Sequence, residues 1–268
     1  MRMGSTSSFS LAFNLAFKMT AKQVIIRSSD MVDFTMNKNN LEFFTGSFPS
    51  ADACAESGDP IPLIESSKIL QLLFEFVEQK PPPTLDGISF DDLLRLAEAA
   101  EKYIVYSALT ICKIKLREFI SSNPVEILTL AVKHNHSDLI VALYPLLMDK
   151  PLPEVAPILG SGSFQYFAHW SLQNSRWSEA LNTATRSAND HGNCPWWGYN
   201  MAQILYQLDK PSRLTQPHLG DIFQNFLSNP HHNTCCRSAV SQWEADITAK
   251  VKDIPEFSLD LRLWGEDG

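Results

Sequence analysis

The sequence predicts an α+β fold that is predominantly α, in which a few short strands precede helical hairpins and a second helical region. Segments 24–26 and 32–36 are β-branched or alternate apolar and polar residues, a pattern typical of strands. From residue 66 onward, apolar residues recur at helical spacing. Five Pro and Gly residues between 149 and 162 predict a break between two regions.

The first two strands are predicted to form a hairpin, because Ser28, Ser29 and Asp30 supply turn residues between them. A short helix is expected over 39–44, followed by a loop over 50–60. A third strand is expected over 62–65. Its proline cannot donate a hydrogen bond, so the strand is expected at an edge of the sheet or to begin there.

Helices are predicted for most of the remaining chain. The first has a continuous apolar stripe and a cap at Ser66 or Ser67, and prolines 81–83 end it. Ser89 begins another, and Asn123 and Pro124 form a strong start for the next. Further helices are expected near 124–133, 137–148, 163–173, 175–189, 195–208, 217–228 and 237–252. The second of these contains Pro145, which predicts a kink or break.

These elements predict four parts along the chain. Residues 1–21 are a flexible leader, 22–148 a first domain with trailing helices, 149–162 a linker, and 163–268 a helical C-terminal region. Residues 1–29 hold four basic residues and no acid, so a transit or signal peptide is the alternative interpretation of the leader. An extension without a targeting role is favoured, because Asn14 interrupts the apolar run and no small-residue cleavage site follows it.

Composition excludes several classes of protein. The net charge of −8 disfavours nucleic acid and anionic membranes as partners, since phosphate binding needs a concentrated basic surface. No apolar stretch reaches the roughly 20 residues of a membrane span. The chain contains neither glycine-rich nucleotide-binding pattern, and no cofactor is expected. Five cysteines, an odd number, favour reduced thiols and a cytoplasmic or nuclear location.

Four segments of the chain share the pattern of a known family. They are VIIRSSDMVDF from residue 24, MNKNNL from 36, IPLIESSKIL from 61 and LLRLAEAAEKY from 93. In this order they resemble the BTB/POZ proteins that are abundant in mushroom-forming fungi. The resemblance covers residues 22–148 and is looser over 163–261. It implies a BTB/POZ fold and a non-enzymatic protein that binds protein partners, including a second copy of itself.

The resemblance also suggests where a partner would bind. Many BTB domains dimerise through the first helix and its flanking strand, which here offers Val24, Ile26, Leu41 and Phe44. The alternative is that these side chains form the core. Gln23 and Asn37 stand where the family has its usual polar residues. The apolar residues are kept, and because apolar area supplies most of the affinity of such surfaces, self-association is expected.

Two other functions remain open. The resemblance implies that the chain could be a substrate adaptor of a cullin-type ubiquitin ligase, although it has no recognised substrate-binding repeats. An enzyme in the C-terminal helices would have to use a loose polar set comprising His169, Asp190, His191, Cys194 and His218. No nucleophile-elbow motif is present, and Cys112 lies on a predicted apolar helix face.

One cluster has the residue types of a structural zinc site. The segment HGNC begins at His191 and ends at Cys194, and HHNTCC runs from His231 through His232 to Cys235 and Cys236. Zinc prefers tetrahedral cysteine and histidine ligands, and short spacings let one loop supply two of them. The spacing departs from regular zinc patterns, so exposed histidines and packed cysteines are the favoured interpretation, and no metal is predicted.

Overall fold

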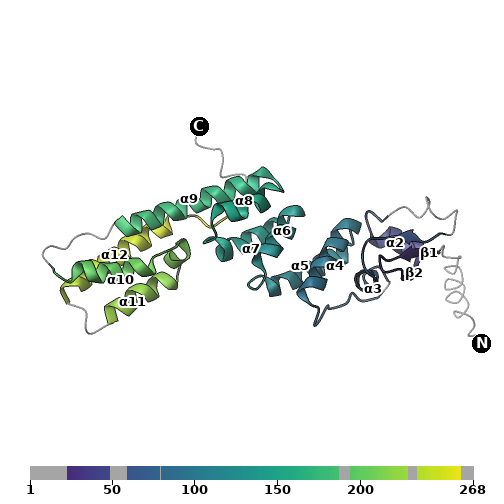
Figure 1. Cartoon of the computed structure of the whole chain (residues 1–268), viewed down its shortest axis with the longest axis horizontal. Coiled ribbons are helices and arrows are strands. Elements are labelled where there is room, and N and C mark those ends of the chain that lie inside the picture. Colours follow the sequence, from purple (N-terminus) through teal and green to yellow (C-terminus); the bar gives the residue numbers. More distant parts are fainter. Residues whose placement is uncertain (1–22, 49–58, 79, 187–193, 229–233, 261–268) are drawn as a thin grey trace, which may run out of the picture. The chain divides into compact units, whose positions relative to one another are not determined.

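The computed structural model describes residues 23–48, 59–78, 80–186, 194–228 and 234–260. The chain divides into two compact units, residues 1–119 and 120–268. The predicted leader lies outside the described residues. The fold is α+β and mostly helical, as the sequence predicts, with one small sheet in the first unit (Figure 1). No helix in the described ranges is both long and apolar enough to cross a lipid bilayer.

The sheet of the first unit has three strands in the order β2-β1-β3. Strands β1 (Gln23–Arg27) and β2 (Asp33–Asn37) form the predicted antiparallel hairpin. Strand β3 (Ile61–Pro62) is shorter than predicted and pairs in parallel with β1, with Ile26 opposite Ile61. Pro62 therefore lies on an edge strand, where a missing N–H is tolerated.

The described residues of the first unit also form four α-helices: α2 (Lys38–Phe44), α3 (Ser67–Glu75), α4 (Phe90–Tyr103) and α5 (Tyr106–Leu116). A short 3-10 helix, η1 (Arg117–Phe119), follows them. The side chain of Ser89 accepts a hydrogen bond from the Asp92 amide and caps α4, as the sequence predicts. Phe34 packs edge-on against Phe74, which joins the inner face of the hairpin to α3.

The described part of the second unit is mostly helical and ends in an extended segment after α12. Its elements are α6 (Pro124–Lys133), α7 (Ser137–Leu147), α8 (Leu152–Gly160), α9 (Phe164–Arg186), α10 (Trp197–Gln207), η2 (Pro211–Leu214), α11 (His218–Ser228) and α12 (Thr234–Lys252). Pro145 lies inside α7 without ending it. Helices α9 and α12 lie side by side (Figure 1).

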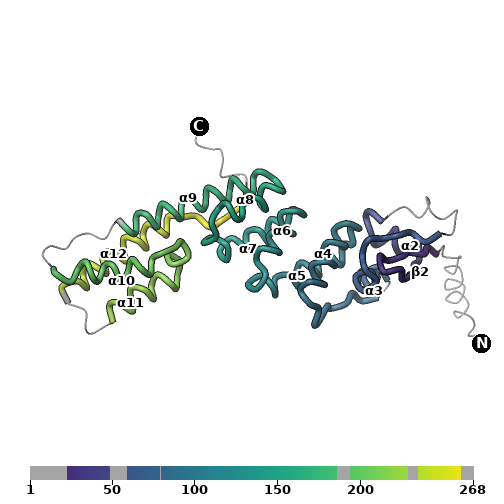
Figure 2. Tube along the Cα trace, viewed as in Figure 1, coloured from purple at the N-terminus to yellow at the C-terminus, as the bar shows by residue number. Residues whose placement is uncertain are grey.

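Two differences from the sequence prediction concern the second unit. The segment 149–162, predicted to be a linker, contains helix α8, and the division between units lies after Phe119 instead. Val155 and Leu159 of α8 are buried, so this segment is part of the core. The helices predicted near 163–173 and 175–189 are one helix, α9, which runs uninterrupted from beside α8 to beside α12 (Figure 2).

The second unit has an apolar core formed by the C-terminal part of α9 together with α10, η2, α11 and α12. It contains Trp243, which is 2% exposed and donates a hydrogen bond from its indole nitrogen to the Ala184 carbonyl at 2.8 Å. Phe223 of α11 meets the Trp243 ring edge-on. This core also holds Cys236, which is fully buried. The packing of α9 and α11 on α12 thus fixes the position of one cysteine of the candidate cluster.

Candidate functional site

The structure places three of the four predicted partner-binding residues in the core. Val24, Ile26 and Leu41 are 8%, 0% and 3% exposed, respectively. They cannot contact a partner while the unit stays folded, so this part of the prediction is wrong. Phe44 is half-buried and packs against Phe43 with ring centroids 5.0 Å apart.

Two exposed apolar residues are immediate neighbours of the predicted ones. Ile25 is 37% exposed on the outer face of β1, and Phe43 is 81% exposed on α2. Successive side chains of a strand point to opposite faces. Because Val24 and Ile26 face the core, Ile25 between them faces outward. The sequence did not reveal which of these residues faces outward, because residues 24–26 are all apolar.

The outer face of the hairpin has little net charge. Gln23, Ile25 and Thr35 are exposed there, and Ile25 pairs with Thr35 across the strands. Arg27 and Asp33 neutralise each other through two hydrogen bonds of 2.6 and 2.8 Å. The hydrogen bond from Arg27 lowers the pKa of the Asp33 carboxyl. The outer face therefore offers uncharged or internally paired side chains.

The second candidate site is a cluster of three thiols in the second unit. The Sγ atom of Cys194 lies 3.5 Å from that of Cys236 and 3.6 Å from that of Cys235. The sulfurs of Cys235 and Cys236 are 3.9 Å apart. The three atoms thus form a nearly equilateral triangle, built from residues 41 and 42 positions apart.

Two helix starts bring these thiols together. Cys194 lies just before α10, whereas Cys235 and Cys236 belong to the first turn of α12. Hydrogen bonds from the backbone N–H groups of Trp196 and Trp197 lower the pKa of the Cys194 thiol. Burial raises the pKa of Cys236 to about 11. Cys194 is half-buried and Cys235 is exposed, so one edge of the triangle is open to solvent.

The structure thus joins the three cysteines of the candidate cluster, for which the sequence analysis predicted no metal. The three histidines proposed with them, His191, His231 and His232, lie outside the described residues. Asn200, a residue that the sequence analysis did not single out, adjoins the cluster and acts to lower the pKa of Cys236. Its side chain is 3% exposed, and its Nδ2 atom makes no hydrogen bond of normal geometry in the described part of the chain.

Cys112 behaves differently from the clustered thiols. It lies in α5 of the first unit and is 1% exposed. Burial raises its pKa to about 12, so the reactive thiolate is disfavoured. The prediction that Cys112 is a small buried apolar residue is confirmed.

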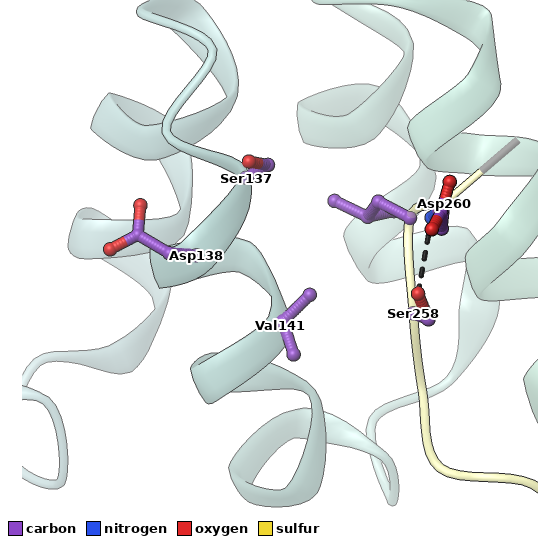
Figure 3. Close-up of a pocket in the computed structure, with 6 residues that line it drawn as sticks. Ser137, Asp138, Val141, Ser258 and Asp260 are labelled. Atoms are coloured by element: carbon purple, nitrogen blue, oxygen red, sulfur yellow. Dashed lines mark hydrogen bonds between the residues drawn. The ribbon is translucent and has the colours of Figure 1, made fainter.

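An open pocket of about 440 Å³ lies elsewhere in the second unit. Figure 3 shows Ser137, Asp138 and Val141 of α7 on one side and Ser258 and Asp260 of the extended C-terminal segment on the other. The Asp260 amide donates a hydrogen bond to the Ser258 hydroxyl. None of the polar residues considered for an enzyme lines this pocket, and two of them, Asp190 and His191, fall outside the described residues.

Comparisons with known proteins add no family to this picture. No protein-family model matches the chain, and neither a curated protein nor a solved structure matches it.

Proposed function

We propose that the chain is a non-enzymatic protein–protein interaction module whose first unit is a BTB/POZ domain that self-associates. The observation that carries this proposal is the exposure of Phe43, an aromatic side chain left 81% exposed on α2. The odd number of cysteines supports a reducing compartment, the cytoplasm or nucleus, as its location.

The order of the elements supports the BTB assignment. The segment VIIRSSDMVDF covers β1, the turn and the start of β2, and MNKNNL covers the end of β2 and the first part of α2. The segment IPLIESSKIL begins with β3 and continues into α3, while LLRLAEAAEKY lies within α4. Each family-like segment therefore coincides with an element of the kind that the resemblance implies.

The exposed apolar side chains supply a physical reason to associate. Burying an exposed Phe side chain is worth about 1.5–3 kcal/mol, which is a factor of roughly ten to a hundred in affinity. A stable interface buries about 1,200–2,000 Å² in total, so one anchor, Phe43, is not enough. We propose the outer face of the hairpin as the second part of this surface.

A second copy of the chain is the partner that the charges favour. Two chains with a net charge of −8 repel each other, and a face with little net charge lowers this repulsion at the contact. The row of Gln23, Ile25 and Thr35, ending in the Arg27–Asp33 ion pair, has this property. Such a face can meet its own copy without placing like charges opposite each other.

Light scattering on the full chain across a micromolar concentration series tests this proposal. The wild-type protein is expected to approach twice the mass of one chain as its concentration rises. Phe43→Asp places a charge at the anchor and should weaken dimerisation at least tenfold, with unchanged helical content by circular dichroism. Phe164→Asp is the matched control, because Phe164 is also exposed, at 75%, but lies in the second unit.

Two results would overturn self-association: a wild-type chain that stays monomeric throughout, or equal dimerisation of the wild type and Phe43→Asp. A monomer that captures a purified cullin would support the adaptor function instead. Dimerisation lost equally in Phe164→Asp and Phe43→Asp would also count against the assigned face.

A further inference from the structure

The three clustered thiols have the geometry of a metal site rather than of a disulfide. Their Sγ–Sγ distances are 3.5, 3.6 and 3.9 Å. A tetrahedral zinc ion with Zn–S bonds of about 2.3 Å holds its sulfur ligands about 3.8 Å apart. A disulfide would need two sulfurs at about 2.05 Å. All three distances lie within a few tenths of an ångström of the tetrahedral edge.

Rigid parts of the second unit hold the cluster. Cys236 is fully buried in the core that includes Trp243, so its sulfur cannot move away freely. Cys235 precedes it in the same helix, α12, and Cys194 packs partly against the same core. Preorganised ligands of this kind reduce the entropy that a metal ion must overcome when it binds.

The surroundings suit thiolates. The backbone N–H groups of Trp196 and Trp197 at the start of α10 donate to the Cys194 sulfur. Cys235 and Cys236 lie in the first turn of α12, where the positive end of the helix dipole stabilises negative charge. The buried Asn200 side chain lies beside the Cys236 sulfur and makes no other hydrogen bond from its Nδ2 atom in the described residues. This amide would donate to the metal-bound Cys236 sulfur, as second-shell partners of metal sites commonly do.

We propose that Cys194, Cys235 and Cys236 bind one zinc ion in a structural site that joins the start of α10 to the start of α12. Each thiol loses its proton when its sulfur binds, so zinc binding releases these protons to solvent. Soft sulfur ligands at tetrahedral spacing favour zinc over magnesium or calcium, which prefer oxygen. The site is independent of the proposed BTB function, because it lies wholly in the second unit.

Metal analysis of the full chain, purified under reducing conditions, tests the site directly. One zinc ion per chain is expected, and a strong chelator should remove it. Reloading with cobalt should give a sulfur-to-cobalt charge-transfer band and the visible spectrum of a tetrahedral ion. X-ray absorption of the zinc protein should show at least three sulfur ligands near 2.3 Å, and it identifies the remaining ligand.

Two substitutions separate metal binding from folding. Cys235→Ser changes an exposed residue and should lower zinc affinity by more than about 100-fold, because loss of second-shell partners alone costs 10–100-fold. Cys112→Ala is the control, since Cys112 belongs to the other unit and should leave zinc affinity unchanged. A competition titration against a coloured chelator measures both affinities.

Several outcomes would overturn the site. One is reduced protein that takes up no zinc, and another is a spectrum with fewer than three sulfur ligands. Equal zinc affinity of the wild type and Cys235→Ser would also contradict it. A disulfide that links Cys194 to Cys235 or Cys236 in protein purified under reducing conditions would show that the cluster is a redox pair instead.

Discussion

The carboxylate of Asp30 accepts two hydrogen bonds from Ser67, one from the backbone amide at 2.7 Å and one from the hydroxyl at 2.6 Å. Asp30 lies in the β1–β2 turn and Ser67 is the first residue of α3, so the contact spans 37 positions. Ser66, expected from the sequence as a possible cap, makes no side-chain cap. Asp30 supplies that function from a distance and ties the hairpin to the helix start.

Replacing Asp30 should make the stability of the first unit depend less on acidic pH. Hydrogen bonds from Ser67 and Ser28 lower the pKa of Asp30 from 3.8 to about 2. A carboxyl with a lowered folded-state pKa stabilises the fold above its unfolded pKa and loses that contribution as pH falls through the folded value. Asp30→Asn should therefore lower the melting temperature at pH 7.

The pH dependence distinguishes this contact from a general packing effect. The melting-temperature gap between wild type and Asp30→Asn should shrink as the pH falls from about 4 toward about 2, because the wild-type carboxyl then becomes protonated. Thermal unfolding by circular dichroism at several pH values measures the gap. A gap that stays constant over this range would contradict the assignment.

Two glycines two positions apart test whether the segment 149–162 is packed. A methyl group added at Gly162 would meet the Val132 side chain at 2.6 Å and the Val132 carbonyl at 2.9 Å, whereas one added at Gly160 meets nothing within 4 Å. Gly162→Ala should destabilise the protein by about 1–3 kcal/mol through overpacking. Gly160→Ala should be neutral or slightly stabilising. Urea unfolding of both variants measures the difference, and equal midpoints would favour the linker prediction.

The hydrogen bond between Trp243 and Ala184 should contribute measurably to the second unit. Trp243→Phe keeps an aromatic ring but removes the indole donor to the Ala184 carbonyl, which should cost about 1–3 kcal/mol. Trp196→Phe is the control, because Trp196 is 57% exposed and exposed changes usually stay within about 0.5 kcal/mol. If denaturant unfolding gave similar losses of unfolding free energy for Trp243→Phe and Trp196→Phe, the hydrogen bond would contribute little.

The sequence predicted most elements but not the faces that they present. The hairpin and its turn follow from alternation and turn residues, and the structure has both. The run of three apolar residues at 24–26 contains no alternation, so it could not show that Ile25 is the outward one. On α2, the adjacent Phe43 and Phe44 leave the same ambiguity. Which of two neighbouring apolar residues is exposed depends on the other elements that cover the sheet.

The predicted linker failed because the positions of its breakers matter more than their number. Pro151 and Pro153 lie at the start of α8, where helix N–H groups have no partner within the helix, and Gly160 ends it. Only Pro157 lies in the interior, and burial of Val155 and Leu159 offsets the hydrogen bond it removes. Composition alone could not distinguish these cases.

The thiol cluster could be proposed from residue types but not from spacing. Cys194 and Cys235 are 41 positions apart, a separation without a regular motif. The contact arises because α10, α11 and α12 pack on one core and return the chain to the same place. Such convergence depends on tertiary packing, which the local pattern of a single sequence does not contain.

Because α9 is one continuous helix, it couples the stability of the two ends of the second unit. Near its start, Trp170 packs with Tyr144 and with Phe257 of the C-terminal segment, and near its end Ala184 belongs to the Trp243 core. Its 23 residues span about 35 Å without a break in their hydrogen-bond ladder. Local unfolding of the elements around either end would remove the side-chain packing that stabilises that half of α9. Backbone amides at both ends should therefore exchange with solvent through one shared opening event, so a ligand that binds beside α12 would also protect amides around Trp170.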